Sequence, residues 1–183
     1  MARFFDILFS GFGLLVLSPV IISLLIIGLF DTGSPLFRQE RVGFHQKPFK
    51  LLKFRSMNVY TQSVATHLVQ ASSITRWGSF LRKSKLDELP QLYNVLVGDM
   101  SFVGPRPNLF NQMELIEERV KRGIYRVRPG ITGLAQIQKI DMSIPELLAE
   151  TDSRMISQLN IWIYFKYIFL TIFGKGFGDR VRK

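Results

Sequence analysis

The 183-residue sequence contains no cysteine and only two histidines, His45 and His67. Without thiols, the chain has no disulfide, no cysteine-ligated zinc or iron–sulfur site and no thiol nucleophile. The two histidines are too few and too far apart in the sequence to suggest a histidine-based metal site. Internal repeats and the Walker and Rossmann glycine motifs are also missing. These absences argue against a thiol enzyme and against a glycosyltransferase with a nucleotide-binding Rossmann half.

Negative charge is scarce, because 24 Lys and Arg stand against 14 Asp and Glu, which gives a net charge of +10. Residues 32–139 carry the whole excess, with 17 basic and 7 acidic residues. Such a field attracts nucleic acid, anionic lipid headgroups or phosphorylated substrates. The hydrophobic content of 47% is high for a basic soluble protein. We therefore expect one domain with a membrane appendage.

The appendage is residues 7–30, which hold no charged residue and are rich in Leu, Ile, Val and Phe. The run is long enough for a bilayer core of about 30 Å, and it is too long for a secretory signal. Proline at Pro19 removes one helix hydrogen bond, and the Ser18 hydroxyl can bind a freed carbonyl. Because positive charge lies at both ends of the run, we favour a re-entrant membrane hairpin over residues 1–31. A single spanning helix is the alternative.

The remaining residues, 32–183, are expected to form the second part of the chain, a globular domain. Residues 36–42 and 48–55 show the partial alternation of a short β-hairpin. Lys53 and Arg55 continue the apolar face of its second strand. These two cations either reach phosphate or headgroups, or they lie on a solvated edge strand.

Three helices are expected further along the chain. Asn108 can cap a helix that runs to about Arg122 and stops at Gly123. The apolar face of this helix is predicted to comprise Met113, Ile116 and Val120. A capping box, Ser143-Ile144-Pro145-Glu146, opens the second helix. The apolar side of that helix is predicted to comprise Ile144, Leu147, Leu148 and Met155.

Acidic residues gather in residues 141–154, which we expect to face away from an anionic surface. Contact of one of these acids with a nucleotide or sugar is the alternative. Residues 159–173 are aromatic and apolar, with a single charge at Lys166. This pattern favours a helix in the membrane interface over one packed inside the domain. The predicted fold is therefore α+β: a small globular domain with a short β-hairpin, a re-entrant helix-break-helix and interfacial amphipathic helices.

The side chains best suited to chemistry lie in residues 82–107. Asp87 and Glu88 follow a cluster of three cations, Arg82, Lys83 and Lys85. A carboxylate beside cations stays ionised, so it can bind a divalent cation or attack phosphorus. The alternative is that Ser84 caps a helix and the two acids only favour its dipole.

A stiff segment follows, Gly104-Pro105-Arg106-Pro107. Prolines on both sides of Arg106 restrict the backbone and so fix where its guanidinium emerges. Guanidinium groups bind phosphate oxygens through paired hydrogen bonds. Carboxylates and fixed cations together suit phosphoryl transfer, in which a protein supplies mainly position and charge.

An ordered series of motifs resembles the bacterial sugar transferases of the monotopic phosphoglycosyl transferase superfamily. The central motifs are Leu86-Asp87-Glu88-Leu89-Pro90-Gln91-Leu92, Asn94-Val95-Leu96, Gly98-Asp99-Met100-Ser101 and Val103-Gly104-Pro105-Arg106-Pro107. Further matches are Arg41-Val42-Gly43, Lys53-Phe54-Arg55-Ser56-Met57 and Arg128-Pro129-Gly130-Ile131-Thr132-Gly133-Leu134-Ala135-Gln136. The series spans most of the chain and resembles the small, catalytic-core form, without the extra transmembrane region of larger members. Lys85 departs from the pattern, since the family commonly has Ser or Thr there.

The resemblance implies transfer of a phospho-sugar from a UDP-sugar to undecaprenyl phosphate, with release of UMP. Asp87 would be the nucleophile and a ligand of Mg²⁺, and Glu88 would assist as an acid/base or metal-shell group. Phosphate binding would fall to Lys53, Arg55, Arg82, Arg106 and Arg128. Pro105 and Pro107 would shape the nucleotide site, and Ser18-Pro19 would be the break of the re-entrant hairpin. The small members favour a 2-acetamido sugar.

The resemblance also implies that residues 32–183 are a cytoplasmic, interfacial catalytic domain. It implies a location at the cytoplasmic face of the bacterial inner membrane, in contact with membrane lipids and without nucleic acid. The oligomeric state stays open, a homo-oligomer included. Two other classes of protein account for the charge and the apolar run: a membrane-anchored module that binds nucleic acid or anionic lipid, and a non-catalytic scaffold of a glycan assembly complex. Neither gives a reason for Asp87 and Glu88 beside the cations.

Overall fold

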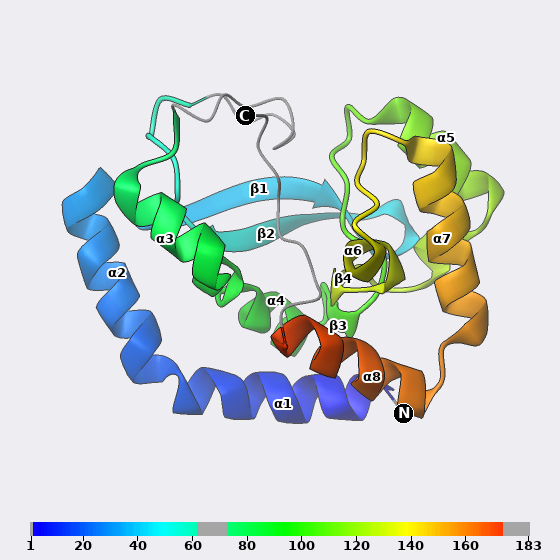
Figure 1. The fold of residues 1–183 in the computed structure, drawn as a ribbon, viewed down its shortest axis with the longest axis horizontal. Helices are drawn as coiled ribbons and strands as arrows, with labels where there is room; N and C mark the ends of the chain where they lie inside the picture. Colours follow the sequence, from blue (N-terminus) through cyan, green and yellow to red (C-terminus); the bar gives the residue numbers. More distant parts are fainter. Residues whose placement is uncertain (1, 62–72, 174–183) are drawn as a thin grey trace.

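The computed structural model describes residues 2–61 and 73–173, and the basic tail from Lys175 lies outside this range. It confirms the predicted α+β class, with a central antiparallel hairpin, a short parallel pair of strands and helices around both (Figure 1). The elements are α1 Ala2–Val16, α2 Ser18–Thr32, β1 Leu36–Val42, η1 Phe44–Gln46, β2 Pro48–Phe54, α3 Arg76–Ser84, η4 Leu86–Glu88, α4 Gln91–Val97, β3 Ser101–Val103, α5 Met113–Lys121, η5 Ile124–Arg126, β4 Gly130–Thr132, α6 Leu134–Gln138, α7 Pro145–Gln158 and α8 Ile161–Ile172.

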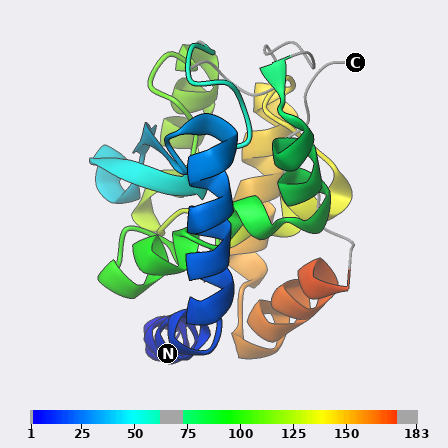
Figure 2. The same ribbon diagram turned by 90° about the vertical axis from the view of Figure 1, so that its left-hand side faces the viewer.

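The apolar N-terminal run forms two helices that meet at an elbow of 63° (Figures 1 and 2). The Ser18 hydroxyl donates to the Leu15 carbonyl at 2.7 Å. Proline at position 19 has no N–H for this carbonyl, so the predicted hydrogen bond at the break is confirmed. Among the described residues, no single helix is both long and apolar enough to cross a membrane, whereas α1 and α2 together meet those two criteria.

Polar residues at the start of α1 fasten this helix to the rest of the molecule. Asp6 is 2% exposed, and its Oδ1 accepts from the Ser101 hydroxyl at 3.0 Å, the Phe102 amide at 3.0 Å and the Tyr164 hydroxyl at 2.7 Å. Burial and the contact with Asp6 raise the pKa of the Tyr164 hydroxyl well above its ordinary value. Asp6 therefore joins α1 to β3 and α8, a role that the hydropathy pattern did not predict.

The predicted hairpin forms, with β2 one residue shorter than expected, and Arg41 pairs with Phe49 and Phe37 with Lys53. One face of it is buried, and its members are Gln39, Arg41, Phe49, Leu51 and Lys53. The outer edge of β2 is covered by Asn94 from α4. The Asn94 side chain accepts from the Leu52 amide at 3.0 Å and donates to the Lys50 carbonyl at 2.9 Å. Lys53 thus lies on a buried face, and the solvated-strand alternative is wrong for this residue.

Strands β3 and β4 bring two motifs that are distant in sequence into contact. They pair in parallel, with Ser101 opposite Gly130 and Val103 opposite Thr132. A Cβ at Gly130 would lie 2.1 Å from the backbone nitrogen of Gly104, so neither glycine leaves room for a side chain. The backbones of Gly104 and Gly130 therefore lie in close contact.

Two helix starts and one helix cap differ from prediction. Ser84 ends α3 and donates to the Phe80 and Leu81 carbonyls, because Lys85 adopts a left-handed conformation (φ 59°) and stops the helix there. Asn108 is fully buried and makes no cap, since α5 begins at Met113. Helix α7 starts at Pro145 as expected, but the Ser143 hydroxyl donates to Asp141 and does not cap it.

The apolar faces of these helices also differ from prediction. In α5 the buried side chains are Leu115 and Arg119, whereas Met113 and Val120 are exposed. In α7 the side turned inward comprises Leu148, Ala149, Thr151, Asp152 and Met155. Two of the predicted α7 positions, Ile144 and Leu147, are exposed. Buried polar residues shifted both faces, and apolar periodicity does not detect such residues.

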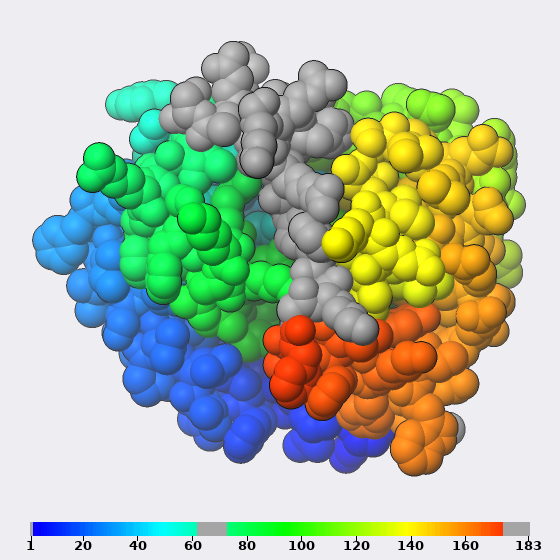
Figure 3. Space-filling view, viewed as in Figure 1, coloured from blue at the N-terminus to red at the C-terminus, as the bar shows by residue number. Residues whose placement is uncertain are grey.

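Helix α8 lies beside α1 at the lower edge of the molecule (Figures 1 and 3). Phe165 packs edge-on against Phe5 and Phe9, with ring centroids 5.2 and 6.0 Å apart. The opposite side of α8 is open, and Trp162 is 82% exposed. One side of α8 packs inward, so packing inside the domain is confirmed in part, whereas the position of its exposed side in the membrane interface stays a prediction. Helices α1, α2 and α8 together expose the apolar residues Phe4, Ile7, Leu8, Phe9, Phe12, Leu15, Val16, Val20, Ile22, Ile26, Ile27, Leu29, Phe30, Trp162, Phe169 and Ile172.

Candidate active site

The two adjacent acids lie on a tight turn between two helices. After the left-handed residue Lys85, the chain makes the 3₁₀ turn η4, and Pro90 then precedes α4. Leu86 and Leu89 pack into an apolar cluster with Leu24 of α2 and Leu81 of α3. This packing fixes the turn from its apolar side. Asp87 is 8% exposed, so the turn does not present a freely solvated carboxylate.

Two cations from distant parts of the sequence converge on Glu88. Its Oε1 accepts from Arg106 Nη2 at 2.9 Å and from Lys53 Nζ at 3.4 Å. The three side chains are between 9% and 18% exposed. Charge-assisted hydrogen bonds in a poorly solvated setting are stronger than surface ion pairs. The structure thus brings together Lys53, Glu88 and Arg106, with Asp87 beside them in the chain.

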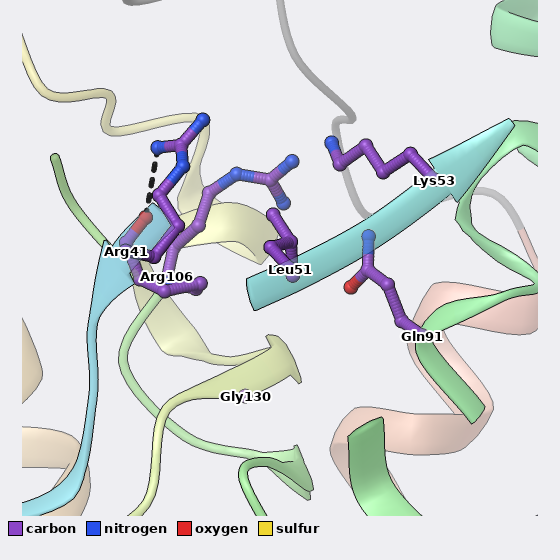
Figure 4. Close-up of a pocket in the computed structure, with 7 residues that line it drawn as sticks. Arg41, Leu51, Lys53, Gln91, Arg106 and Gly130 are labelled. Carbon is purple, nitrogen blue, oxygen red and sulfur yellow. Dashed lines mark hydrogen bonds between the residues drawn. The ribbon is translucent and has the colours of Figure 1, made fainter. Parts of the chain in front are cut away.

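A polar pocket opens at this cluster (Figure 4). Its lining residues are Arg41, Leu51, Lys53, Gln91, Arg106, Pro107 and Gly130. Figure 4 shows the side chains of Lys53 and Arg106 directed toward the same space, the first from β2 and the second from the proline-flanked segment. Arg41 donates to the Pro107 carbonyl at 3.1 Å and to Gln39 at 2.5 Å. Such a concentration of positive charge suits a diphosphate.

Two lining residues with polar side chains were not chosen as site residues from the sequence. Arg41 belongs to the Arg-Val-Gly motif, which was the signal that could have selected it, and it is 6% exposed. Gln91 follows Pro90 in the central motif and is 3% exposed. Neutral amides carry no charge pattern in a sequence, so only the motif points to Gln91.

The other predicted phosphate ligands lie elsewhere. Arg82 donates from Nε to the Ser56 hydroxyl at 2.8 Å, and its Nη1 is buried without a hydrogen-bond partner among the described residues. Arg55 donates to the Ser34 carbonyl at 2.8 Å, and its guanidinium lies over the Phe37 ring. Arg128 donates to the Gly98 carbonyl at 2.8 Å and stacks on Phe44. Phosphate binding by Arg55 and Arg128 stays a prediction.

Behind the pocket, Arg119 of α5 and Asp152 of α7 form a buried ion pair at 2.6 Å. Each is 1% exposed. Asp152 is thus held in a buried ion pair, and contact of one of the acids in residues 141–154 with a nucleotide or sugar stays a prediction. Burial also raises the pKa of the nearby Tyr125 hydroxyl, which donates to Asn108 at 3.0 Å.

In the part of the chain that the structure describes, no three His, Asp or Glu side chains gather as a metal cluster. A divalent cation carried by a diphosphate needs fewer protein ligands, because Mg²⁺ typically takes one or two carboxylates together with substrate phosphates. Asp87 and Glu88 supply two adjacent carboxylates beside the basic pocket, so the residues present fit a magnesium–diphosphate complex and do not form a preassembled metal cage.

The chain resembles known proteins over nearly its whole length. A family model described as bacterial sugar transferase matches residues 1–176. The UDP-glucose:undecaprenyl-phosphate glucose-1-phosphate transferase of Escherichia coli (strain K12) is 41% identical over 96% of the chain. The uncharacterized sugar transferase EpsL of Bacillus subtilis (strain 168) is 38% identical over 94% of the chain and 85% of that protein.

A third relative is the UDP-N-acetylgalactosamine-undecaprenyl-phosphate N-acetylgalactosaminephosphotransferase of Aeromonas hydrophila, which is 34% identical over 97% of the chain. The chain spans 40% of the length of the Escherichia coli protein and 44% of the Aeromonas hydrophila protein.

Proposed function

The chain belongs to the bacterial sugar transferase family, and on that premise we propose that it is a phosphoglycosyl transferase. It moves a phospho-sugar from a UDP-sugar to undecaprenyl phosphate at the cytoplasmic face of the bacterial inner membrane. The products are undecaprenyl diphosphate-sugar and UMP. The names of the Escherichia coli and Aeromonas hydrophila relatives describe this general reaction for those proteins.

The observation that carries the proposal is the convergence of Lys53 and Arg106 on Glu88, next to Asp87 and at a pocket lined by basic side chains. When a nucleotide diphosphate enters this pocket, its phosphate oxygens would replace the Glu88 carboxylate as partners of Lys53 and Arg106. Arg82 is not among the residues that line this pocket, but its buried Nη1 has no hydrogen-bond partner among the described residues. Because a buried donor without a partner is costly, this nitrogen is suited to receive a phosphate oxygen.

In the proposed reaction, a carboxylate oxygen of Asp87 attacks the β-phosphorus of the UDP-sugar. The bond from that phosphorus to the bridging oxygen breaks, and UMP leaves with the bond's electron pair. A covalent aspartyl phospho-sugar remains. A phosphate oxygen of undecaprenyl phosphate then attacks the same phosphorus and releases the Asp87 carboxylate. Glu88 holds Lys53 and Arg106 in place before the substrate enters and serves as the neighbouring acid or base during the two steps.

Asp87 and Glu88 would hold Mg²⁺ together with the substrate diphosphate. When bound, the ion offsets phosphate charge and so lowers the cost of nucleophilic attack by a carboxylate. Around it, the chain's own residues exclude water and fix the phosphates. Leu51 and Gly130 form the apolar and backbone walls of the pocket, and Lys53 and Arg106 bring the positive charge.

The exposed apolar faces of α1, α2 and α8 suit an acceptor that stays in the bilayer. Extracting a polyprenyl chain would cost about 0.8 kcal/mol for each buried CH₂ group, so an enzyme at the membrane surface avoids that cost. For the sugar we propose a 2-acetamido sugar. The relatives named above act on glucose and N-acetylgalactosamine by name, so the sugar is best identified with a panel of donors.

The test is UMP release from a panel of UDP-sugars by the detergent-solubilised chain with Mg²⁺ and undecaprenyl phosphate. We expect release from one sugar class that depends on the acceptor and is lost in Asp87→Asn. The matched control is Asp141→Asn, which changes an exposed carboxylate and should leave the rate unchanged. Release that persists in Asp87→Asn would contradict the nucleophile. No release from any sugar by folded protein would favour a scaffold or an anion-binding module.

A further inference from the structure

The buried side chain of Arg119 reaches the segment that holds Arg106. Arg119 is 1% exposed and projects from α5. Its Nη1 donates to the backbone carbonyl of Arg106 at 2.9 Å and to Asn108 Oδ1 at 2.9 Å, and its Nη2 donates to Asp152 Oδ2 at 2.6 Å. One guanidinium therefore links α5, α7 and the backbone of the residue that contacts Glu88.

This contact matters because the Arg106 backbone has little freedom of its own. Pro105 and Pro107 restrict the dihedral angles around it, so the segment moves largely as a unit. Arg119 holds the carbonyl of Arg106, and Arg41 holds the next carbonyl, that of Pro107, at 3.1 Å. With these two carbonyls bound, the direction in which the Arg106 side chain leaves the backbone is set.

On this basis we propose that Arg119 is a positioning residue for the proposed transferase, acting through Arg106 on the charge arrangement at Glu88. Asp152 orients Arg119 from the opposite side. The inference rests on the proposed function for its kinetic test, but its geometric part stands on the contacts alone.

A role limited to holding α5 against α7 explains the contacts less well. The neighbouring apolar cluster of Leu115, Ala135 and Leu148 already supplies packing at that junction. A buried ion pair is weak evidence for stability, since desolvating two charges offsets much of their attraction. The pair does provide a charged donor that fixes a carbonyl in the site segment, which apolar side chains cannot do.

The variants are Arg119→Lys and Arg119→Met, assayed for UMP release in detergent with Mg²⁺ and undecaprenyl phosphate. Lysine keeps the charge but cannot reach three acceptors with a planar fork. We expect kcat to fall by about 100-fold in Arg119→Met, the scale of a 1 Å misplacement, and to recover in part in Arg119→Lys. Since Arg119 does not line the pocket, KM for the UDP-sugar should change much less than kcat.

The decisive comparison combines Arg119→Met with Arg106→Met. If Arg119 acts through Arg106, the double variant should be no slower than Arg106→Met alone. Leu115→Ala is the matched control, because it loosens the same α5–α7 junction without touching Arg106. The fold-decreases in kcat caused by Leu115→Ala and by Arg106→Met should multiply in their double variant. If the decreases caused by Arg119→Met and Arg106→Met also multiply, the proposal is overturned.

Hydrogen exchange provides a test that needs no activity. Amides in residues 104–109 should exchange faster in Arg119→Met than in Leu115→Ala at matched global stability. Equal exchange in the two variants would also overturn the positioning role. A wild-type chain without UMP release would instead count against the proposed function, and the exchange result would still decide whether Arg119 holds the segment.

Discussion

At the scale of single residues, the site depends on one carboxylate oxygen that two cations share. Lys53 and Arg106 come from β2 and from the proline-flanked segment, and both donate to Glu88 Oε1. The sequence predicted each of the three as a site residue, but it gave no sign that Glu88 orders the other two. Asp87 and Glu88 are adjacent in the chain and differ in their proposed roles, since Asp87 is the nucleophile and Glu88 organises the charge.

The first prediction follows from that division. Replacing Glu88 by Gln keeps the shape but removes the negative charge that holds Lys53 and Arg106. We expect UMP release to slow by about 100-fold, within the range for loss of an acid–base group. Asp87 remains in place, so the covalent intermediate should still be trapped with the UDP-sugar alone. The control is Glu117→Gln, an exposed carboxylate on α5. A full rate in Glu88→Gln would show that the ion pairs are incidental.

At the scale of elements, the parallel strands β3 and β4 hold two segments of the site together. Their pairing places the segment carrying Arg106 directly against Gly130 at the start of β4, which also lines the pocket. Gly104 donates its amide to the Thr132 carbonyl, and Gly130 donates to the Pro105 carbonyl, both at 2.9 Å. The spacing between the two backbones is set by the absence of side chains at these glycines.

The second prediction tests the close contact between the Gly104 and Gly130 backbones. Gly130→Ala would place a Cβ 2.1 Å from a backbone nitrogen, and backbone cannot yield as a flexible side chain can. We expect a loss of about 1–3 kcal/mol of stability, as for other overpacked positions, with a lower melting temperature in detergent. Gly11→Ala is the control, because that Cβ would meet only Leu96 Cδ1 at 3.9 Å and lies in a helix, where alanine is favoured. Equal melting temperatures would contradict the assigned contact.

How far the sequence predicts these elements depends on what each pattern records. The β-hairpin and the elbow at Ser18-Pro19 were found correctly, because alternation and a proline inside an apolar run are local signals. The starts of α4 and α5 were missed, since a left-handed Lys85 and a buried Asn108 are set by tertiary contacts. Asp6 and Arg119 were missed for the same reason: a buried charge looks like any surface charge until its partners are known.

At the scale of the whole molecule, both ends of the α1–α2 pair are fastened to the same body. Arg3 donates to the carbonyls of Val95 and Leu96, at 2.5 and 2.8 Å, and so satisfies the C-terminal end of α4. At the other end, Thr75 donates to Asp31 at 2.8 Å, and Leu24 of α2 packs against Phe54 and Leu81. A helix pair that crossed a bilayer could not keep both attachments, because the body would then have to reach both surfaces.

The third prediction is therefore a hairpin that enters and leaves one leaflet with its apolar faces in lipid. The chain has no cysteine, so single cysteines report without background. We would place one directly after Met1 and another at Lys47, an exposed residue after the turn between β1 and β2. In intact cells an impermeant thiol reagent should label neither cysteine, and in inverted membrane vesicles it should label both. Labelling of the N-terminal cysteine from outside intact cells would require a spanning pair. It would also require the hydrogen bonds of Arg3 and Asp6 to be broken in the membrane. The melting temperatures of Arg3→Met and Asp6→Asn variants in lipid test those hydrogen bonds independently.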